Sequence, residues 1–317
     1  MIQRREFLYL YDLKMVNPNG DPDNNAPRID PVTQKCYVTD VRLKRYIRDL
    51  LAARYGEDAI LVTRLGGEPV TLQKRVEAKF GKKVKGDPTT TLCETFIDLR
   101  LFGSPLAFNL GKDKTSDAKG EKKMQSLVGP VQIRFGESLH PVESVVVRGT
   151  STMASKDGND AGTYTDITVL PYAVIGFHGI INENAARHTH LTEEDVTLFM
   201  DCLWKSVRES PSANTRSKAG QQPLLLLDIA YKPGTEYHIG RLPDLLDVAT
   251  SAGTQPVRGP DDYTIRFETL LTDLARSADK IDRIAVTVSP PFARRYAAAL
   301  TKFASLLPDG RVTVTVA

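Results

Sequence analysis

Four basic side chains gather on one side of a predicted helix near the start of the chain. The stretch VRLKRYIRDLLAARY, residues 41–55, follows two possible capping residues, Thr39 and Asp40, and stops before a glycine. At 100° per residue its apolar side chains share one face, and the opposite face carries Arg42, Lys44, Arg45 and Arg48. No acid at i+4 lies within that basic face, since Asp49 sits only at its margin. Because Lys and Arg bind phosphates and release counterions, this face favours a polyanion, although chance clustering on a solvated helix gives the same pattern.

Further cations lie in polar loops that glycines and hydroxyl-bearing residues flank. Three runs hold them: Lys82, Lys83 and Lys85; Lys112, Lys114, Lys119, Lys122 and Lys123; and Arg216 with Lys218. Any single run is usually a solvated loop, but glycine also lets backbone amides approach a phosphate. Together with the helix, the runs make nucleic acid the leading class of ligand. The aromatic motif of the standard RNA-stacking sheet is absent, so we do not expect base stacking of that kind.

A long loop at residues 17–31, NPNGDPDNNAPRIDP, concentrates oxygen-bearing side chains. A calcium loop of the EF-hand type needs Gly at its sixth position and Glu at its twelfth. Counted from Asn17, those positions hold Pro22 and Arg28, so the calcium hypothesis fails. Hydrogen bonds from Asn and Asp side chains to the neighbouring backbone explain the composition better.

The same loop leaves one catalytic alternative open. Asp21, Asp23 and Asp30 could serve a metal-dependent ribonuclease, because two-metal cleavage needs several converging carboxylates. They share one loop, and no partner carboxylates are evident elsewhere in the sequence. We keep a ribonuclease that uses Asp21 and Asp23 as the first alternative. A protein-interaction scaffold that binds no nucleic acid is the second.

The usual short catalytic motifs do not occur in this chain. It has no Walker loop, no GxGxxG, no GxSxG and no HExxH. His188 and His190 form a pair, whereas a zinc site needs three or four ligands. Cys36, Cys93 and Cys202 are far apart, which argues for a reducing compartment. We therefore expect no catalytic residue, no metal site and no cofactor.

Length and composition place the chain among ordinary globular proteins. It has 317 residues, of which 41% are hydrophobic and 26% charged, and this excludes disordered and fibrous classes. A net charge of +3 permits a nucleic-acid partner without requiring one. The N-terminus has no signal-peptide pattern, and no apolar run reaches the roughly 18 residues of a membrane span. We expect a soluble, cytoplasmic protein that does not contact membranes.

Strands and helices alternate along the predicted chain. Strands are predicted at residues 6–16, 142–149, 167–181 and 224–231, and helices at residues 41–55 and 191–207. A mostly helical stretch at residues 262–279, a strand, a helix and a last strand complete the C-terminal part. Residues 57–130 have the character of an elaboration on a core. The order favours an α+β fold, and a split βαβ, ferredoxin-like core with large insertions fits best.

Several motifs, taken in order, resemble a known family. They are FLYLYDLKMVNPNGDPDNNAPRID, YVTDVRLKRYIRDLL, DLRLFGSPL, LPYAVIGFHGIIN, and LTEEDVTLFMDCLWKSV followed by SANTRSKAG. Over most of its length the chain resembles the repeated backbone subunit of type I CRISPR effector (Cascade) complexes, which coats the guide RNA and belongs to the RAMP superfamily. The type I-B and I-C branch is the most similar.

The resemblance implies a fold, a role and a set of partners. The fold would be one RRM-like (ferredoxin-like) palm domain over residues 1–317, with a finger-type insertion at residues 57–130 and a thumb-type insertion at residues 148–168. Copies would stack along the CRISPR guide RNA and present its bases to target DNA in antiviral defence, without catalysis. The implied partners are the guide RNA, target DNA through the guide, other copies of the chain, and the large, small and guide-end-binding Cascade subunits.

The expected RNA contacts combine the helix argument with the resemblance. The palm helix of the family contacts guide phosphates, and Lys44, Arg45 and Arg48 occupy that helix here. The resemblance also implies that Met153 and Tyr164 of the thumb wedge against bases. The complete expected set is Arg28, Thr39, Arg42, Lys44, Arg45, Arg48, Met153, Tyr164, Arg216 and Lys218.

Overall fold

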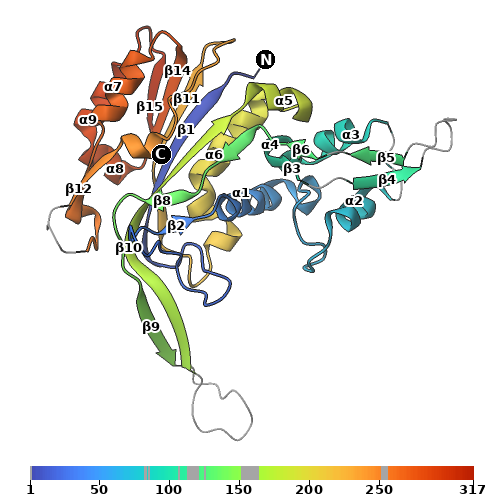
Figure 1. Cartoon of the computed structure of the whole chain (residues 1–317), viewed down its shortest axis with the longest axis horizontal. Coiled ribbons are helices and arrows are strands. Elements are labelled where there is room, and N and C mark those ends of the chain that lie inside the picture. The colour runs from blue at the N-terminus through green and yellow to red at the C-terminus, as the bar shows by residue number, and fades with distance from the viewer. Residues whose placement is uncertain are drawn as a thin grey trace, which may run out of the picture.

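One long sheet runs through the middle of the molecule (Figure 1). The computed structural model describes residues 2–81, 84, 86–105, 108–112, 121–124, 126–150, 164–250 and 256–317. The main path of the sheet is ordered β15 (Val312–Val316), β14 (Ile281–Val288), β11 (Gln221–Tyr231), β1 (Arg5–Val16), β10 (Tyr164–Ile181), β8 (Gly136–Ser138) and β2 (Tyr37–Val38). Two further strands, β7 (Val131–Ile133) and β9 (Val145–Thr150), also pair with β10. Strand β1 is in the middle of this order, and it pairs antiparallel with β10 on one side and with β11 on the other.

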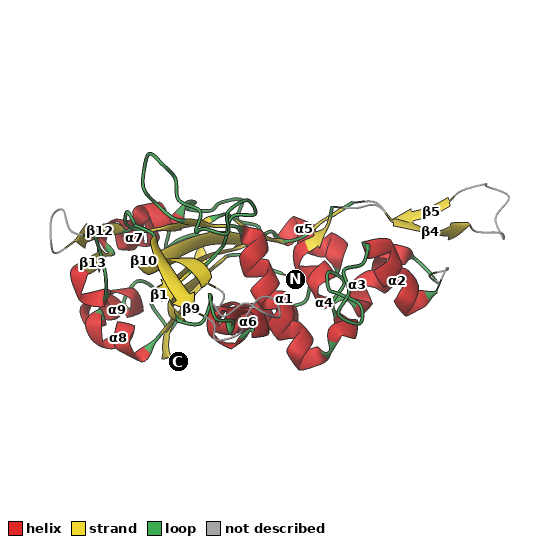
Figure 2. Cartoon of the chain, turned by 90° about the horizontal axis from the view of Figure 1, so that it is seen from below, coloured by secondary structure: helices red, strands yellow, loops and turns green. Residues whose placement is uncertain are grey.

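Two helices, α1 (Asp40–Tyr55) and α6 (Glu193–Glu209), cover one face of the sheet (Figure 2). Successive side chains of a strand point to opposite faces, so every second residue of β1 reaches this side. Phe7, Tyr9 and Tyr11 are buried there among the apolar side chains of the two helices. The α+β class predicted from the order of elements is confirmed by this arrangement.

Residues at the helix ends set where α1 and α6 begin and stop. The Thr39 side chain accepts the backbone N–H of Arg42 and caps α1, which ends at Gly56 with a φ of 87° that glycine adopts without strain. Thr192 and Asp195 form a capping box at the start of α6. Helix α5 (Glu183–Thr189) precedes α6, and the 3-10 turn η2 (Pro211–Ala213) follows it. None of the helices in the described ranges has the length and apolar character that crossing a bilayer requires.

The C-terminal part of the chain packs on the other face of the sheet. Leu8 and Leu10 of β1 are buried there with Tyr263 and Phe267. The covering elements include β12 (Asp247–Thr250), β13 (Tyr263–Arg266), α7 (Glu268–Arg276), α8 (Pro290–Arg295), α9 (Ala297–Ala304) and η3 (Leu242–Leu245). The 3-10 turn η4 (Pro260–Asp262) directly precedes β13. The mostly helical prediction for residues 262–279 is wrong at its start, because YTIR alternates buried and exposed residues and forms strand β13.

Residues 57–130 form a small unit beside the sheet, with an apolar core of its own (Figure 1). Leu61, Val76, Leu92 and Phe96 are fully buried in this core. The unit comprises η1 (Glu57–Ala59), α2 (Leu72–Phe80), α3 (Pro88–Thr95), α4 (Ile97–Phe102) and the short strands β3 (Gly103–Ser104), β4 (Phe108–Lys112), β5 (Glu121–Met124) and β6 (Leu127–Val128).

Strand β9 and the beginning of β10 form a two-stranded ribbon that extends away from the sheet (Figure 1). The pairing runs from Val145 opposite Val169 to Thr150 opposite Tyr164. Val146 is 58% exposed on this ribbon, and no second layer of described residues buries it. Residues 151–163, which connect the two strands, lie outside the described ranges.

A buried carboxylate attaches the side unit to α1. Asp98 is 1% exposed, and it accepts hydrogen bonds from Arg48 Nε at 2.9 Å and from the backbone N–H groups of Leu61 at 2.7 Å and Val62 at 3.1 Å. Three donors satisfy this carboxylate, which offsets the cost of removing its charge from water. One side chain therefore fixes the helix, the turn at residues 61–62 and α4 together.

Replacing this carboxylate should destabilise the protein strongly. Asp98→Ala leaves the largely buried Arg48 guanidinium and two N–H groups without an acceptor, and the free energy of unfolding should fall by about 3–5 kcal/mol. Asp49→Ala is the matched control, because Asp49 pairs with the half-exposed Arg45 on the surface of α1 and its loss should cost only about 0.3–0.5 kcal/mol. Urea unfolding of both variants measures the difference, and equal effects would contradict the anchoring role of Asp98.

Candidate nucleic-acid interface

Two long loops meet beside the N-terminus of α1. The Asn17 N–H donates to the Ser217 carbonyl at 2.9 Å, and the Lys14 N–H donates to the Gly220 carbonyl at 3.1 Å. Gly220 has a φ of 118°, and a Cβ there would lie 2.7 Å from the Lys14 carbonyl oxygen. Glycine is therefore required for this close approach. The contacts bring residues 17–31 and 210–220 to the same place, although almost two hundred residues separate them in the sequence.

Asn19 connects the first loop to the start of α1. Its Oδ1 accepts hydrogen bonds from the Thr39 N–H at 3.0 Å and from the Thr39 hydroxyl at 2.8 Å. The same hydroxyl accepts the Arg42 N–H, so Thr39 is held between the loop and the helix. Thr39 was expected to contact RNA, and the structure shows that its side chain first orients the end of the helix.

Two cations at this helix end lack an acidic partner among the described residues. Arg42 lies over the Tyr46 ring, 5.7 Å from its centroid, and no carboxylate within the described ranges is at ion-pair distance from it. Lys218 is 8% exposed, and its Nζ donates to the Asn17 carbonyl. The pKa of Lys218 is lowered to about 8, mainly because the side chain is buried and also because the charge of Arg42 is nearby. Two cations beside the positive end of a 16-residue helix form a site that attracts an anion.

Unpaired polar atoms lie beneath the same surface. Within the described part of the chain, Asn17 Oδ1, Gln221 Oε1 and the Tyr11 hydroxyl are buried and have no hydrogen-bond partner. The Gln221 amide also donates to the Tyr46 hydroxyl at 3.3 Å, which places it under Arg42. Buried groups of this kind are normally satisfied, and these three are exceptions among the described residues.

The other three cations of the basic face predicted on α1 are neutralised. Lys44 pairs with Asp40 at 2.9 Å, Arg45 with Asp49 at 2.8 Å, and Arg48 with Asp98 at 2.9 Å. The interpretation of a stripe without acidic partners is therefore wrong for these three residues. The helical-wheel argument considered only acids four residues after each cation. Lys44 instead pairs with Asp40, four residues before it, and Arg48 pairs with Asp98, fifty residues away. Both side chains also lie over the Phe102 ring, at 5.6 and 5.0 Å from its centroid.

The remaining residues that were expected to contact RNA differ in their position and in how much of them the structure describes. Arg216 is exposed in the second loop, next to the site. Arg28 is partly buried in the first loop, and its Nε has no partner within the described ranges. Met153 lies outside the described residues. For Tyr164 the structure describes the backbone, which begins β10, and not the side chain.

Asn17, Asn19 and Gln221 belong to the site and were missed by the sequence analysis. All three are uncharged, whereas the predicted contacts were cations, the hydroxyl-bearing Thr39 and residues implied by the resemblance. The available signal was the NPN triplet directly after a strand. Amide side chains at such a position commonly hold the backbone of a functional loop.

Side chains of the first loop form the turns expected for Asn and Asp. Asp21 Oδ1 accepts the Asp23 N–H at 3.0 Å, and Asp30 Oδ1 accepts the N–H groups of Thr33 and Val32 at 2.7 and 2.8 Å. The bonds from Thr33 and Val32 lower the pKa of Asp30. The turn interpretation of this loop is confirmed. Within the described ranges, no three His, Cys, Asp or Glu side chains are grouped as a metal site would need.

The lowered pKa of Lys218 predicts a particular dependence of stability on pH. Its pKa in the folded chain, about 8, is below the ordinary 10.5, so between these values the unfolded chain binds more protons and stability rises with pH. Relative to Lys218→Met, the wild-type free energy of unfolding should gain up to about 3 kcal/mol over this interval. Denaturant titrations of both proteins across the interval measure the gain. Parallel pH profiles would show that Lys218 is not held in this environment.

Comparison with known proteins identifies the family. The sequence model described as "CRISPR-associated protein Cas7" matches residues 3–268. A curated protein of Haloferax volcanii, named "CRISPR-associated protein Cas7", is 32% identical over 301 residues, covering 90% of this chain and 86% of its own length. A chain of a solved "CRISPR RNA-guided surveillance complex, pre-nicking" shares the fold, with a TM-score of 0.54 at 12% identity over 90% of this chain and 92% of that one. The match over most of its length shows that this chain belongs to the Cas7 family of CRISPR-associated proteins.

Proposed function

We propose that this chain is a non-catalytic backbone subunit of a type I CRISPR effector (Cascade). In this proposal the chain binds the guide RNA by contacting the phosphates of the RNA. The observation that carries this proposal is the site at the start of α1, where Arg42 and Lys218 lack acidic partners within the described ranges. The site offers two positive charges and the side-chain amides of Asn17 and Asn19. It suits an anion repeated along a strand, and such contacts position a nucleic acid without reading its sequence.

The architecture supports the proposed role. Strands β1, β8, β10 and β11 are ordered β11-β1-β10-β8, with α1 and α6 on one face, which is the arrangement of a split βαβ or ferredoxin-like palm. In this proposal the unit at residues 57–130 is the finger-type insertion. The ribbon of β9 and β10 with its connection, residues 148–168, is the thumb-type insertion. The phosphate site then lies at the palm, between its two neighbouring loops.

The assembly follows from the chemistry of a repeated site. Each copy would hold a short segment of guide by its backbone, so several copies would line the RNA and leave base edges free for target DNA. The relative in the pre-nicking structure is part of an RNA-guided surveillance complex. We propose corresponding partners here: guide RNA, target DNA through the guide, other copies, and the large, small and guide-end-binding subunits. The proposed place of action is the cytoplasm.

Removing the charge of Arg42 should weaken RNA binding for every guide sequence alike. Arg42→Gln keeps the helix but loses a charged hydrogen-bond donor, so affinity for a single-stranded RNA should fall about tenfold. The slope of log K against log salt should become shallower by about 0.7, the share of one phosphate on a single strand. Filter binding of RNAs of two unrelated sequences at several salt concentrations measures both quantities.

Two variants serve as controls for Arg42. Arg266→Gln removes an exposed arginine that pairs with Asp247 on β12 and should leave binding unchanged. Arg45→Gln removes the most exposed of the ion-paired cations of α1, with a side chain 41% exposed, and should have a smaller effect than Arg42→Gln. An Arg42→Gln protein with wild-type affinity and salt slope would disprove the assignment.

The ribonuclease alternative predicts that Asp21 and Asp23 are catalytic, whereas our proposal predicts that they are not. In our proposal neither carboxylate is catalytic, and that of Asp21 accepts the Asp23 N–H in a turn. Asp21→Asn with Asp23→Asn should therefore leave RNA both bound and intact in magnesium-containing buffer. Gel analysis of end-labelled RNA after incubation with the wild-type and double-variant proteins tests this. Magnesium-dependent cleavage by the wild type that the double variant loses would overturn the non-catalytic role.

A further inference from the structure

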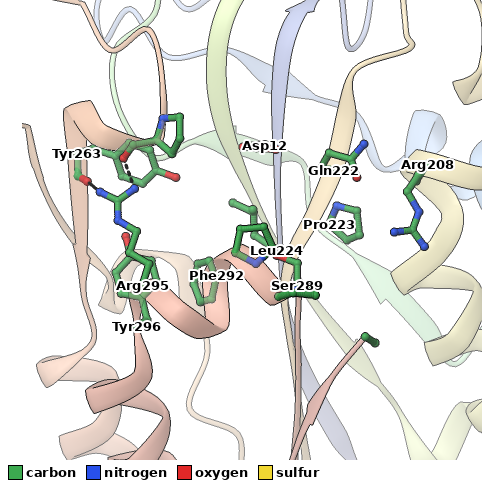
Figure 3. Close-up of a pocket in the computed structure, with 14 residues that line it drawn as sticks. Asp12, Arg208, Gln222, Pro223, Leu224, Tyr263, Ser289, Phe292, Arg295 and Tyr296 are labelled. Carbon is green, nitrogen blue, oxygen red and sulfur yellow. Dashed lines mark hydrogen bonds between the residues drawn. The ribbon is translucent and has the colours of Figure 1, made fainter.

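A pocket of about 410 Å³ lies beside α8, where β11, β14 and β15 come to an end of the sheet (Figure 3). Its walls are mainly apolar, and its charged groups, Asp12, Arg208 and Arg295, are of both signs. Arg295 donates to backbone carbonyl groups, which leave its charge unneutralised. These groups do not define one class of ligand. Strand β15 ends directly before Ala317, which lines the pocket, and this strand carries a more specific signal.

Strand β15 forms an open edge of the sheet. It pairs in parallel with β14 and is the last strand of the main path (Figure 1). The Ile284 N–H donates to the Arg311 carbonyl at 2.9 Å, and the Ala317 N–H donates to a carbonyl of β14 at 2.9 Å. Because backbone groups alternate in direction along a strand, every second residue between these two has its N–H and C=O directed away from the sheet. These residues are Val312, Val314 and Val316.

The outward backbone groups of β15 have no partner in the described part of the chain, since no hydrogen bond within these ranges reaches them. The side chains also give none of the usual protection. The strand reads VTVTV and contains neither a charged residue nor a proline, the two residue types that commonly block an open edge. At the other end of the main path, β2 has only two residues, and a short edge strand is itself a protection. The β15 edge is therefore prepared to accept another strand.

A second copy of β15 fits this edge. In an antiparallel pair with Val314 opposite Val314 of the second copy, Val312 of each copy lies opposite Val316 of the other. All three pairs then exchange two hydrogen bonds each, so every outward group is satisfied. The lack of charge is what such pairing requires, because a charge at the central position would face itself. Val312 and Val314 pack against the second core, so the apolar face of the strand would continue into the second copy.

We propose that two copies of the chain associate through their β15 strands, antiparallel about a two-fold axis at Val314, and thereby join their two sheets into one. Such a contact uses the same surface on both copies and closes after two. It therefore differs from the head-to-tail contacts that a row of copies along a guide RNA needs. The inference stands independently of the proposed RNA binding at Arg42.

Sedimentation equilibrium of the full-length, RNA-free chain tests the proposal. Concentrations from about 1 to about 200 µM cover the affinity expected of a short strand pair. We expect an equilibrium between monomer and dimer. Hydrogen exchange of residues 312–316, measured by mass spectrometry, should slow as the concentration rises, because the outward N–H groups become hydrogen-bonded in the dimer.

A pair of charge variants tests the antiparallel arrangement. Thr313 and Thr315 are exposed, and in the proposed register Thr313 of one copy faces Thr315 of the other. Thr313→Lys with Thr315→Lys places like charges opposite each other, so dimerisation should weaken about tenfold. Thr313→Lys with Thr315→Glu is the matched control, because it changes the same two positions and places opposite charges face to face. This control should dimerise at least as tightly as the wild type.

A proline at the centre of the strand tests the hydrogen bonds themselves. Val314→Pro removes an N–H that points away from β14, and an edge strand tolerates proline at such a position. By symmetry the substitution removes both hydrogen bonds of the central pair, so the dimer should be lost. The two charge variants decide the matter even if Val314→Pro does not fold.

Three results would overturn the proposal. The first is a chain that stays monomeric to about 200 µM. The second is equal dimerisation of the two charge variants. The third is slow exchange of residues 312–316 only after the large or small Cascade subunit is added, which would assign the edge to that subunit. None of these results depends on whether Arg42 binds RNA.

Discussion

The burial of both faces of β1 is the constraint from which the rest of the structure follows. A strand with helices on one side and a second layer on the other sends alternate residues into two separate cores. Phe7, Tyr9 and Tyr11 enter the first core, and Leu8 and Leu10 enter the second. Neither face can then serve as an open platform at the centre of the sheet. The polar residues of the candidate site therefore lie in the loops that begin where β1 leaves the sheet.

Charge pairing determines which part of that end can attract a ligand. Acids from α1 itself and from the side unit neutralise Lys44, Arg45 and Arg48, and the Asp98 pair also holds the unit in place. Arg42 and Lys218 remain without acids among the described residues. On this face of α1, Arg42 is therefore the cation left without an acid in the described part of the chain, and Lys218 lies beside it. Two cations next to the positive end of a helix form a more localised site for an anion than a basic face along the whole helix would.

Local patterns in the sequence predicted the elements well and the site only in part. The limits of α1 follow from Thr39 and Gly56, and its buried face follows from helical periodicity, so both could be predicted. The pairing of Arg48 with Asp98 depends on a contact between distant segments, which no local pattern reports. The same holds for Asn17 and Lys218, brought together by the crossing of two loops. The four residues of β13, YTIR, fall within the stretch that was predicted to be mostly helical, because their alternation is too short to outweigh the helical pattern that follows.

The buried charge of Lys218 has a consequence for the lifetime of a free copy. A cation held away from water beside another cation weakens the folded state of an empty subunit. An anion that binds there removes this penalty and also adds its own binding free energy to the stability of the fold. Loaded and empty copies then differ in how often they unfold and become accessible to proteases. Cellular turnover would thus remove surplus subunits that have found no RNA, without any dedicated signal for their destruction.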